Sequence, residues 1–159
     1  MTFNWALGVL MIANSCIKIE TSKFPAVHGE DEEIYNENMY GKALCQYLDK
    51  KFSEVGITSS GFWNEDWGWM QEVNNDEFSM YLCIYSSEFD ASGDPNSYII
   101  MPSEQNGEKW LWSKFRKVNI SNDVLAIMDK ISEIFKNGHE ITNVSRHDDW
   151  PYYKSPPNK

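Results

Sequence analysis

The sequence has few cysteines, and their spacing fits neither a disulfide framework nor a metal site. Only three occur in 159 residues, at Cys16, Cys45 and Cys83, and no two form a C-x-x-C pair. An odd, widely spaced set argues against a disulfide-stabilised fold and against zinc binding. We therefore expect reduced, buried thiols that act as small apolar side chains in a cytosolic protein.

Long hydrophobic runs are also missing, since no stretch approaches the roughly 18 apolar residues that a membrane span needs. The apolar run from Trp5 to Ile12 is short, and no Lys or Arg precedes it. A signal peptide requires such a basic start. We expect a cytoplasmic protein without membrane contact. The alternative is periplasmic or lipoprotein export, because Ala13-Asn14-Ser15-Cys16 is similar to a lipoprotein processing site.

Positive charge is scarce. The chain has 14 Lys and Arg against 24 Asp and Glu, a formal net charge of −10, and its densest basic group is Lys114, Arg116 and Lys117. A protein that binds nucleic acid needs a basic stripe to neutralise phosphates, so we expect no nucleic-acid partner. Strong negative charge favours solubility and fast, salt-sensitive association with basic proteins.

Established catalytic signatures are missing as well. The sequence contains no serine nucleophile elbow, Walker loop, dinucleotide fingerprint or H-E-x-x-H motif. We expect no cofactor, no metal and no enzymatic activity. Two enzymatic alternatives stay open, a carboxylate pair drawn from Glu65, Asp66 and Glu72, and a metal site in which His28 joins the nearby acids.

What the sequence does have is a high aromatic content, 14% of the chain. Aromatic side chains bury large areas, and disordered chains are depleted in them. The length suits one hydrophobic core. We expect a single folded domain over residues 1–150 and a loosely held, proline-containing tail over residues 151–159.

Apolar periodicity predicts an α+β fold with a single antiparallel β-sheet and two α-helices packed on one face. One helix follows a stripe of apolar residues from Tyr40 to Val55 and ends at Gly56, and the other begins near Ser121-Asn122-Asp123 and ends before Gly138. Strands are expected over residues 16–21, 67–73, 78–85, 97–101, 109–118 and 140–145.

Several finer expectations follow from the same pattern. Asn74-Asn75-Asp76 should form a hairpin turn, and residues 86–96 should form a loop. Trp110 and Trp112 should lie on one side of a strand. Tyr81, Cys83 and Tyr85 make the second face of their strand partly apolar, which indicates either a strand covered on both sides or an exposed binding face.

The acidic run of Glu30, Asp31, Glu32 and Glu33 precedes the first predicted helix. Its carboxylates are stabilised there by the positive end of the helix dipole. They could also, with Glu37, meet a basic partner or a cation. The sequence leaves both interpretations open.

The most unusual stretch is Glu65-Asp66-Trp67-Gly68-Trp69. Two tryptophans that flank a glycine at the start of a strand should place both indoles on one face. They are either core residues or, with Glu65 and Asp66, an aromatic and acidic patch of the kind that dominates protein interfaces. The predicted partner-binding residues are therefore Glu30, Asp31, Glu32, Glu33, Glu65, Asp66, Trp67 and Trp69.

A resemblance adds to this interpretation. The segments Phe24-Pro25, Gly29-Glu30-Asp31-Glu32-Glu33, Tyr40-Gly41-Lys42-Ala43-Leu44 and Glu65-Asp66-Trp67-Gly68-Trp69 resemble a small bacterial protein family of uncharacterised function, over about residues 16 to 85. In size and charge the chain is similar to the immunity proteins that bacteria encode beside secreted toxins.

The resemblance to immunity proteins implies a partner, a cognate protein toxin that the chain neutralises by direct binding and that could be basic. It implies no catalytic residues. The alternatives are a carboxylate- or metal-assisted hydrolase and a homo-oligomer held together by the aromatic face of the sheet.

Overall fold

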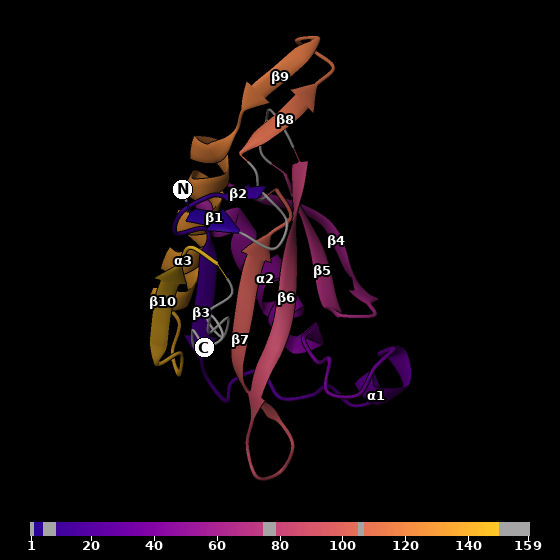
Figure 1. The fold of residues 1–159 in the computed structure, drawn as a ribbon. Coiled ribbons are helices and arrows are strands. Elements are labelled where there is room, and N and C mark those ends of the chain that lie inside the picture. Colours follow the sequence, from indigo (N-terminus) through magenta and orange to yellow (C-terminus); the bar gives the residue numbers. More distant parts are fainter. Residues whose placement is uncertain (1, 5–8, 75–78, 105–106, 150–159) are drawn as a thin grey trace, which may run out of the picture.

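The computed structural model describes residues 2–4, 9–74, 79–104 and 107–149, and its main feature is a six-stranded antiparallel sheet (Figure 1). The strand order is β10-β3-β7-β6-β5-β4. These strands are β3 (Cys16–Glu20), β4 (Thr58–Glu65), β5 (Gly68–Asn74), β6 (Ser79–Phe89), β7 (Pro95–Pro102) and β10 (Asn143–His147). Two shorter antiparallel pairs accompany the sheet, β1 (Thr2–Asn4) with β2 (Val9–Met11) and β8 (Glu108–Leu111) with β9 (Arg116–Asn119).

The two long helices lie on one face of this sheet, as predicted (Figure 1). They are α2 (Lys42–Lys51), which continues into the 3-10 helix η1 (Phe52–Val55), and α3 (Ser121–Lys136). A short helix, α1 (Glu30–Glu33), precedes α2. None of the helices among the described residues is long and apolar enough to cross a membrane.

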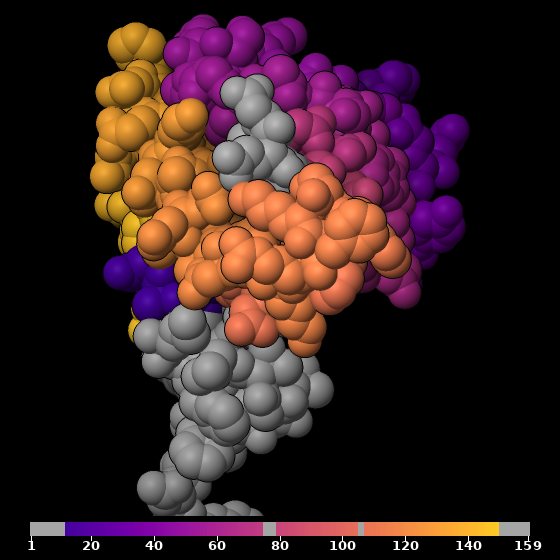
Figure 2. Space-filling view, turned by 90° about the horizontal axis from the view of Figure 1, so that it is seen from above, coloured from indigo at the N-terminus to yellow at the C-terminus, as the bar shows by residue number. Residues whose placement is uncertain are grey.

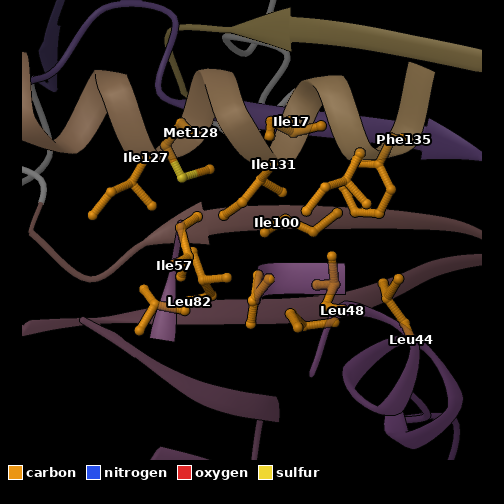
Figure 3. Close-up of a cluster of buried hydrophobic side chains, with 14 of the residues drawn as sticks. Ile17, Leu44, Leu48, Ile57, Leu82, Ile100, Ile127, Met128, Ile131 and Phe135 are labelled. Carbon is orange, nitrogen blue, oxygen red and sulfur yellow. The ribbon is translucent and has the colours of Figure 1, made fainter. Parts of the chain in front are cut away.

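The main hydrophobic core lies between the helices and the sheet (Figure 3). In this view Ile100 of the sheet lies between Ile131 and Phe135 from α3 and Leu44 and Leu48 from α2. All five side chains are fully buried. The four residues from the helices recur at the helical spacing of three and four residues, which explains the apolar stripes in the sequence.

The opposite face of the sheet carries a second, smaller cluster of buried residues, Cys16, Cys83, Ile99 and Met101, with Trp67, Met70 and Tyr85 packed against it. Towards β4 this face becomes exposed. There the rings of Trp63 and Tyr81 meet edge to face at 5.6 Å, and each side chain is 38% exposed. The face is therefore partly buried and partly an exposed aromatic surface.

One of the two predicted helix-end signals is present in the structure and the other is not. Gly56 adopts a left-handed conformation with φ of 72° at the end of η1, as predicted for a glycine that stops a helix. Ser121 begins α3, but neither it nor its two successors forms a side-chain cap. Instead, the side chain of Asn119 accepts the backbone N–H of Ser121 at 2.9 Å.

The predicted loop over residues 86–96 was wrong in its extent. Strand β6 continues to Phe89 and β7 begins at Pro95, so only a short turn separates them. The carboxylate of Asp90 accepts the backbone N–H groups of Ser92 and Asp94 at 2.8 and 3.1 Å, which folds the turn locally. The prediction failed because the end of this hairpin is rich in polar residues, a composition that is also typical of a loop.

The predicted strand over residues 109–118 is instead a hairpin, in which Trp110 pairs with Lys117 across β8 and β9. Its turn runs from Trp112 to Phe115 and contains no glycine, proline or asparagine, so no turn could be predicted there. Strand β4 was not predicted either, because its Thr-Ser-Ser-Gly start has a weak strand propensity.

Some expectations fall outside the described residues, namely the turn at Asn75 and Asp76 and the tail over residues 151–159. The last predicted strand is present as β10, shifted by two to three residues towards the C-terminus, and it pairs with β3.

Candidate functional site

The first residue of the acidic run, Glu30, is completely buried, although it was predicted to be a partner-binding residue. Its Oε1 atom accepts the backbone N–H groups of Gly41 and Lys42, both at 2.9 Å, and its Oε2 atom accepts that of Val27 at 2.8 Å. Gly41 and Lys42 begin α2, where N–H groups lack partners inside the helix. Glu30 therefore caps α2 from a separate segment and is unable to touch a partner directly.

Gly41 in turn packs against Trp69. A Cβ atom on Gly41 would lie 2.8 Å from the indole Cδ1 atom, so only glycine allows this approach. Gly68 makes a similar contact with the neighbouring strand, because a Cβ there would lie 2.5 Å from the backbone oxygen of Ile84. The three sequence segments around Glu30, Gly41 and Trp69 thus meet in one framework.

The other residues of the acidic run point outward. Asp31, Glu32 and Glu33 are exposed, as is Glu37 after them. Asp31 accepts the hydroxyl of Tyr40, and Glu33 forms an ion pair with Lys42.

The segment that follows α1 lies against the turn between β4 and β5 (Figure 1). The backbone N–H of Tyr35 donates to the side chain of Asn64 at 3.3 Å, and the side-chain amide of Asn36 donates to the backbone oxygen of Asp66. The structure therefore brings the two predicted acidic groups together. We call the resulting surface the acidic face and define it by Asp31, Glu32, Glu33, Glu37, Glu65 and Asp66.

An aromatic groove of about 510 Å³ borders the acidic face at Glu33. It is lined by Glu33, Tyr35, Lys42, Phe62, Trp63, Asn64 and Trp69. Tyr35 is 74% exposed, and the indole N–H of Trp63 donates to Glu65 at 2.7 Å. The indole N–H of Trp69 is buried and has no acceptor among the described residues. The groove thus combines exposed rings with Glu33, which is paired with Lys42, and has Glu65 beside it at the Trp63 indole.

Sequence reasoning missed Tyr35 and Trp63 as members of this surface. Tyr35 lies in a polar stretch of the sequence, where an aromatic side chain is expected to be exposed rather than to enter the core. That isolated aromatic residue was the signal from which the surface could have been predicted. Trp63 precedes the Asn64-Glu65-Asp66 segment, but β4 was not predicted, so its face was unknown.

The prediction that Trp67 and Trp69 share one face was wrong. Trp69 is 2% exposed and belongs to the main core, where its ring lies 6.0 Å from that of Phe62. Trp67 lies in the turn before β5 and packs on the opposite face of the sheet, 5.0 Å from the ring of Tyr85. The turn breaks the strand alternation that the prediction assumed. Only Trp67 keeps partial exposure.

The three thiols are buried and free. Burial raises the pKa of Cys16 to about 12 and that of Cys83 to about 11, and it raises the pKa of Cys45 well above its ordinary value. None is an activated nucleophile, because activation requires a lowered thiol pKa. Among the residues that the structure describes, no group of three or more His, Cys, Asp or Glu side chains could hold a metal ion.

A second aromatic surface lies at the opposite end of the molecule, at the turn of the β8–β9 hairpin (Figures 1 and 2). Trp110, Trp112 and Phe115 are 45%, 75% and 76% exposed.

Comparison with known proteins identifies no relative, since no family model, curated protein or solved structure matches the chain.

Proposed function

We propose that this chain is a protein-binding module of the immunity type, which neutralises a cognate toxin by covering its functional surface with the acidic face. The observation that carries the proposal is the meeting of two acidic segments around an aromatic groove. Buried aromatic anchors within a polar rim are the usual architecture of a protein interface.

The charges of the acidic face favour a basic partner. Glu32, Glu37 and Asp66 are exposed, and none of them forms an ion pair with any residue that the structure describes. Their field is therefore available to attract an incoming protein. Electrostatic attraction of this kind raises association rates and falls as salt increases. Tyr35 and Trp63 would supply the buried contacts that slow dissociation.

The framework below the acidic face supports the same proposal. Glu30 fixes α1 to the start of α2, and the Tyr35 and Asn36 contacts fix the next segment to the β4–β5 turn. A surface held in place before binding loses less conformational entropy when the partner arrives.

The experiment is a capture of the tagged protein's partner from its native host, or from coexpression with the product of the adjacent gene, read by mass spectrometry. We expect one stoichiometric, basic protein that elutes at high salt. The variant Glu32→Lys/Glu37→Lys/Asp66→Lys should lose that partner, with an association rate constant reduced about tenfold or more.

A matched control reverses three exposed acids on the helices, as Asp49→Lys/Glu54→Lys/Glu133→Lys. It changes the net charge equally but leaves the acidic face intact. We expect the control to retain the partner. Capture of no partner, or equal capture by both triple variants, contradicts the proposal.

A further inference from the structure

The β8–β9 hairpin projects from the end of the molecule opposite the acidic face (Figure 1). Its base is fixed to the body. Leu111 and Val118 pack against the main core, and the backbone N–H of Ile120 donates to Gly107 at 2.8 Å. The Lys109 ammonium group reaches Glu104 at 2.8 Å. The hairpin is therefore a supported arm rather than a free loop.

The turn of this arm presents aromatic rings to solvent. Trp112 stacks edge to face on Trp110 at 5.9 Å, and Phe115 follows at 76% exposure. Phe115 has a φ of 48°, in the left-handed region that disfavours bulky side chains. Backbone N–H groups of Lys114 and Phe115 close the turn at 3.1 and 3.3 Å, to the oxygens of Leu111 and Trp112. A strained turn that exposes a phenylalanine indicates a role in binding.

The same turn carries the densest positive charge of the chain. Lys114, Arg116 and Lys117 are exposed, and none forms an ion pair with any residue in the described part of the chain. We define the basic tip by these three residues together with Trp110, Trp112 and Phe115. Figure 2 looks down on this end of the molecule, where the hairpin is uncovered.

The basic tip and the acidic face are opposite in charge. One is a projecting aromatic turn with three cations, and the other presents the exposed acids Glu32, Glu37 and Asp66 beside an aromatic groove of about 510 Å³. Because they lie at opposite ends of the folded molecule, they cannot meet within one copy (Figure 1). We infer that the basic tip of one molecule docks into the groove of the acidic face of a second copy of this chain.

The net charge of −10 does not prevent this contact. At physiological ionic strength the Debye length is about 8 Å, so only charges near the contact interact strongly. The exposed acids of the acidic face that are unpaired among the described residues are opposite in sign to the three cations of the basic tip, and Lys42 in the groove is paired with Glu33. Arg and Trp are also the residue types that most often dominate binding at the centre of an interface.

The contact joins two different surfaces, so it is heterologous and leaves one tip and one groove free at the ends of each assembly. Association should therefore continue beyond a dimer, with an average mass that rises steadily with concentration. A single turn in one groove buries less surface than a standard interface, so each contact should be weak. The assembly uses the surface assigned above to the toxin, and a tightly bound toxin would displace it.

The test is sedimentation of the chain alone, from about 10 µM to about 500 µM, a range suited to a weak contact. We expect the average mass of the wild type to rise with concentration and to fall back to that of a monomer at about 1 M salt. The tip variant Lys114→Glu/Arg116→Glu/Lys117→Glu and the face variant Glu32→Lys/Glu37→Lys/Asp66→Lys should each stay monomeric.

Mixing these two variants gives the decisive result, because the intact tip of the face variant then meets the intact face of the tip variant, and the reversed tip meets the reversed face. We expect the mixture to associate as the wild type does, which no loss of folding in either variant could produce. Phe115→Gly removes a ring without changing charge and relieves the turn, so it should be at least as stable and should associate at least tenfold more weakly.

A wild type that stays monomeric throughout, or a mixture that fails to associate, overturns the inference. Binding of a monomeric wild type to phosphatidylserine vesicles, lost in Trp112→Ala, would assign the tip to a membrane surface instead. Since the toxin is not used, failure here leaves the function proposed above standing, and loss of toxin capture leaves this inference standing.

Discussion

The buried carboxylate of Glu30 accepts the backbone N–H of Gly41 at 2.9 Å, across eleven residues of chain. That bond, with its neighbour to Lys42, gives the first turn of α2 the acceptors that its own residues do not provide. An acidic side chain that looked like part of a binding surface is therefore part of the framework that holds the surface.

Replacing Glu30 with alanine should destabilise the fold strongly. The change removes the acceptor of three N–H groups, one buried at Gly41 and two part-buried at Val27 and Lys42. We expect a loss of about 3 kcal/mol in the free energy of unfolding, measured by chemical denaturation. The matched change Glu32→Ala alters an exposed neighbour and should cost less than about 0.5 kcal/mol. Equal effects would refute the capping role.

Gly41→Ala should also destabilise, because the added methyl group would meet the Trp69 indole at 2.8 Å. Overpacking of this kind costs about 1–3 kcal/mol. Tryptophan fluorescence should shift as the Trp69 ring moves. At Gly29, where a Cβ atom meets nothing within 4 Å, alanine tests backbone strain alone, because φ there is 83°. Unchanged fluorescence in Gly41→Ala would contradict the packing.

Phe115→Gly should stabilise the monomer by about 1 kcal/mol, because glycine adopts a left-handed conformation without the penalty that phenylalanine bears. The measurement is thermal or chemical unfolding at low protein concentration, where self-association is absent. A control substitution, Trp112→Ala, removes an exposed ring from the same turn without relieving the backbone. It should leave stability nearly unchanged, and a loss of stability in Phe115→Gly would contradict the strain.

Alkaline titration should reveal tyrosines that ionise late. The hydrogen bond to Asp31 raises the pKa of Tyr40 to about 12, and burial raises the pKa of Tyr85 to about 12. A raised pKa means that the folded state favours the protonated hydroxyl. The stabilisation is therefore complete below about pH 10, the ordinary value, and is lost as the pH rises towards about 12.

Phenolate absorbance should show these late steps, and Tyr40→Phe should remove one of them. The same variant should lose less stability between about pH 10 and about pH 12 than the wild type does. If the titration curve of Tyr40→Phe kept every late step, the Asp31 contact would not be responsible.

The thiols should resist alkylation in the native state. Burial raises the pKa of all three, so little thiolate is present at about pH 8, where an ordinary thiol reacts readily. In denaturant all three should react at once. Labelling followed by mass spectrometry checks this, and rapid native labelling of any one cysteine would show that its cluster opens.

The helices and most central strands could be predicted because their burial repeats with a helical or strand period. Ile131 and Phe135, for example, follow a helical spacing that only one-sided burial explains. The position of Glu30 could not be predicted, since its partners are backbone groups eleven and twelve residues away and leave no trace in composition.

The candidate site was predicted in part. The turn that carries Asp66 does lie against the segment after α1, but Trp69 belongs to the core, and Trp67 lies on the face of the sheet opposite the helices, as the ring of Trp63 does. The aromatic members Tyr35 and Trp63 depend on how β4 meets the segment after α1, which is a tertiary relationship. The β8–β9 turn could not be predicted for a different reason. Its aromatic residues have a high strand propensity, so the segment was predicted as one continuous strand.

Inward and outward positions alternate closely along the segments that build the acidic face. Glu30, Gly41 and Trp69 are buried, whereas Glu32 and Asp66, a few positions away, are exposed. The framework and the proposed recognition surface therefore occupy separate residues of the same short segments. The exposed residues of such a surface can be substituted one at a time to suit a different partner, while the buried residues keep the fold unchanged.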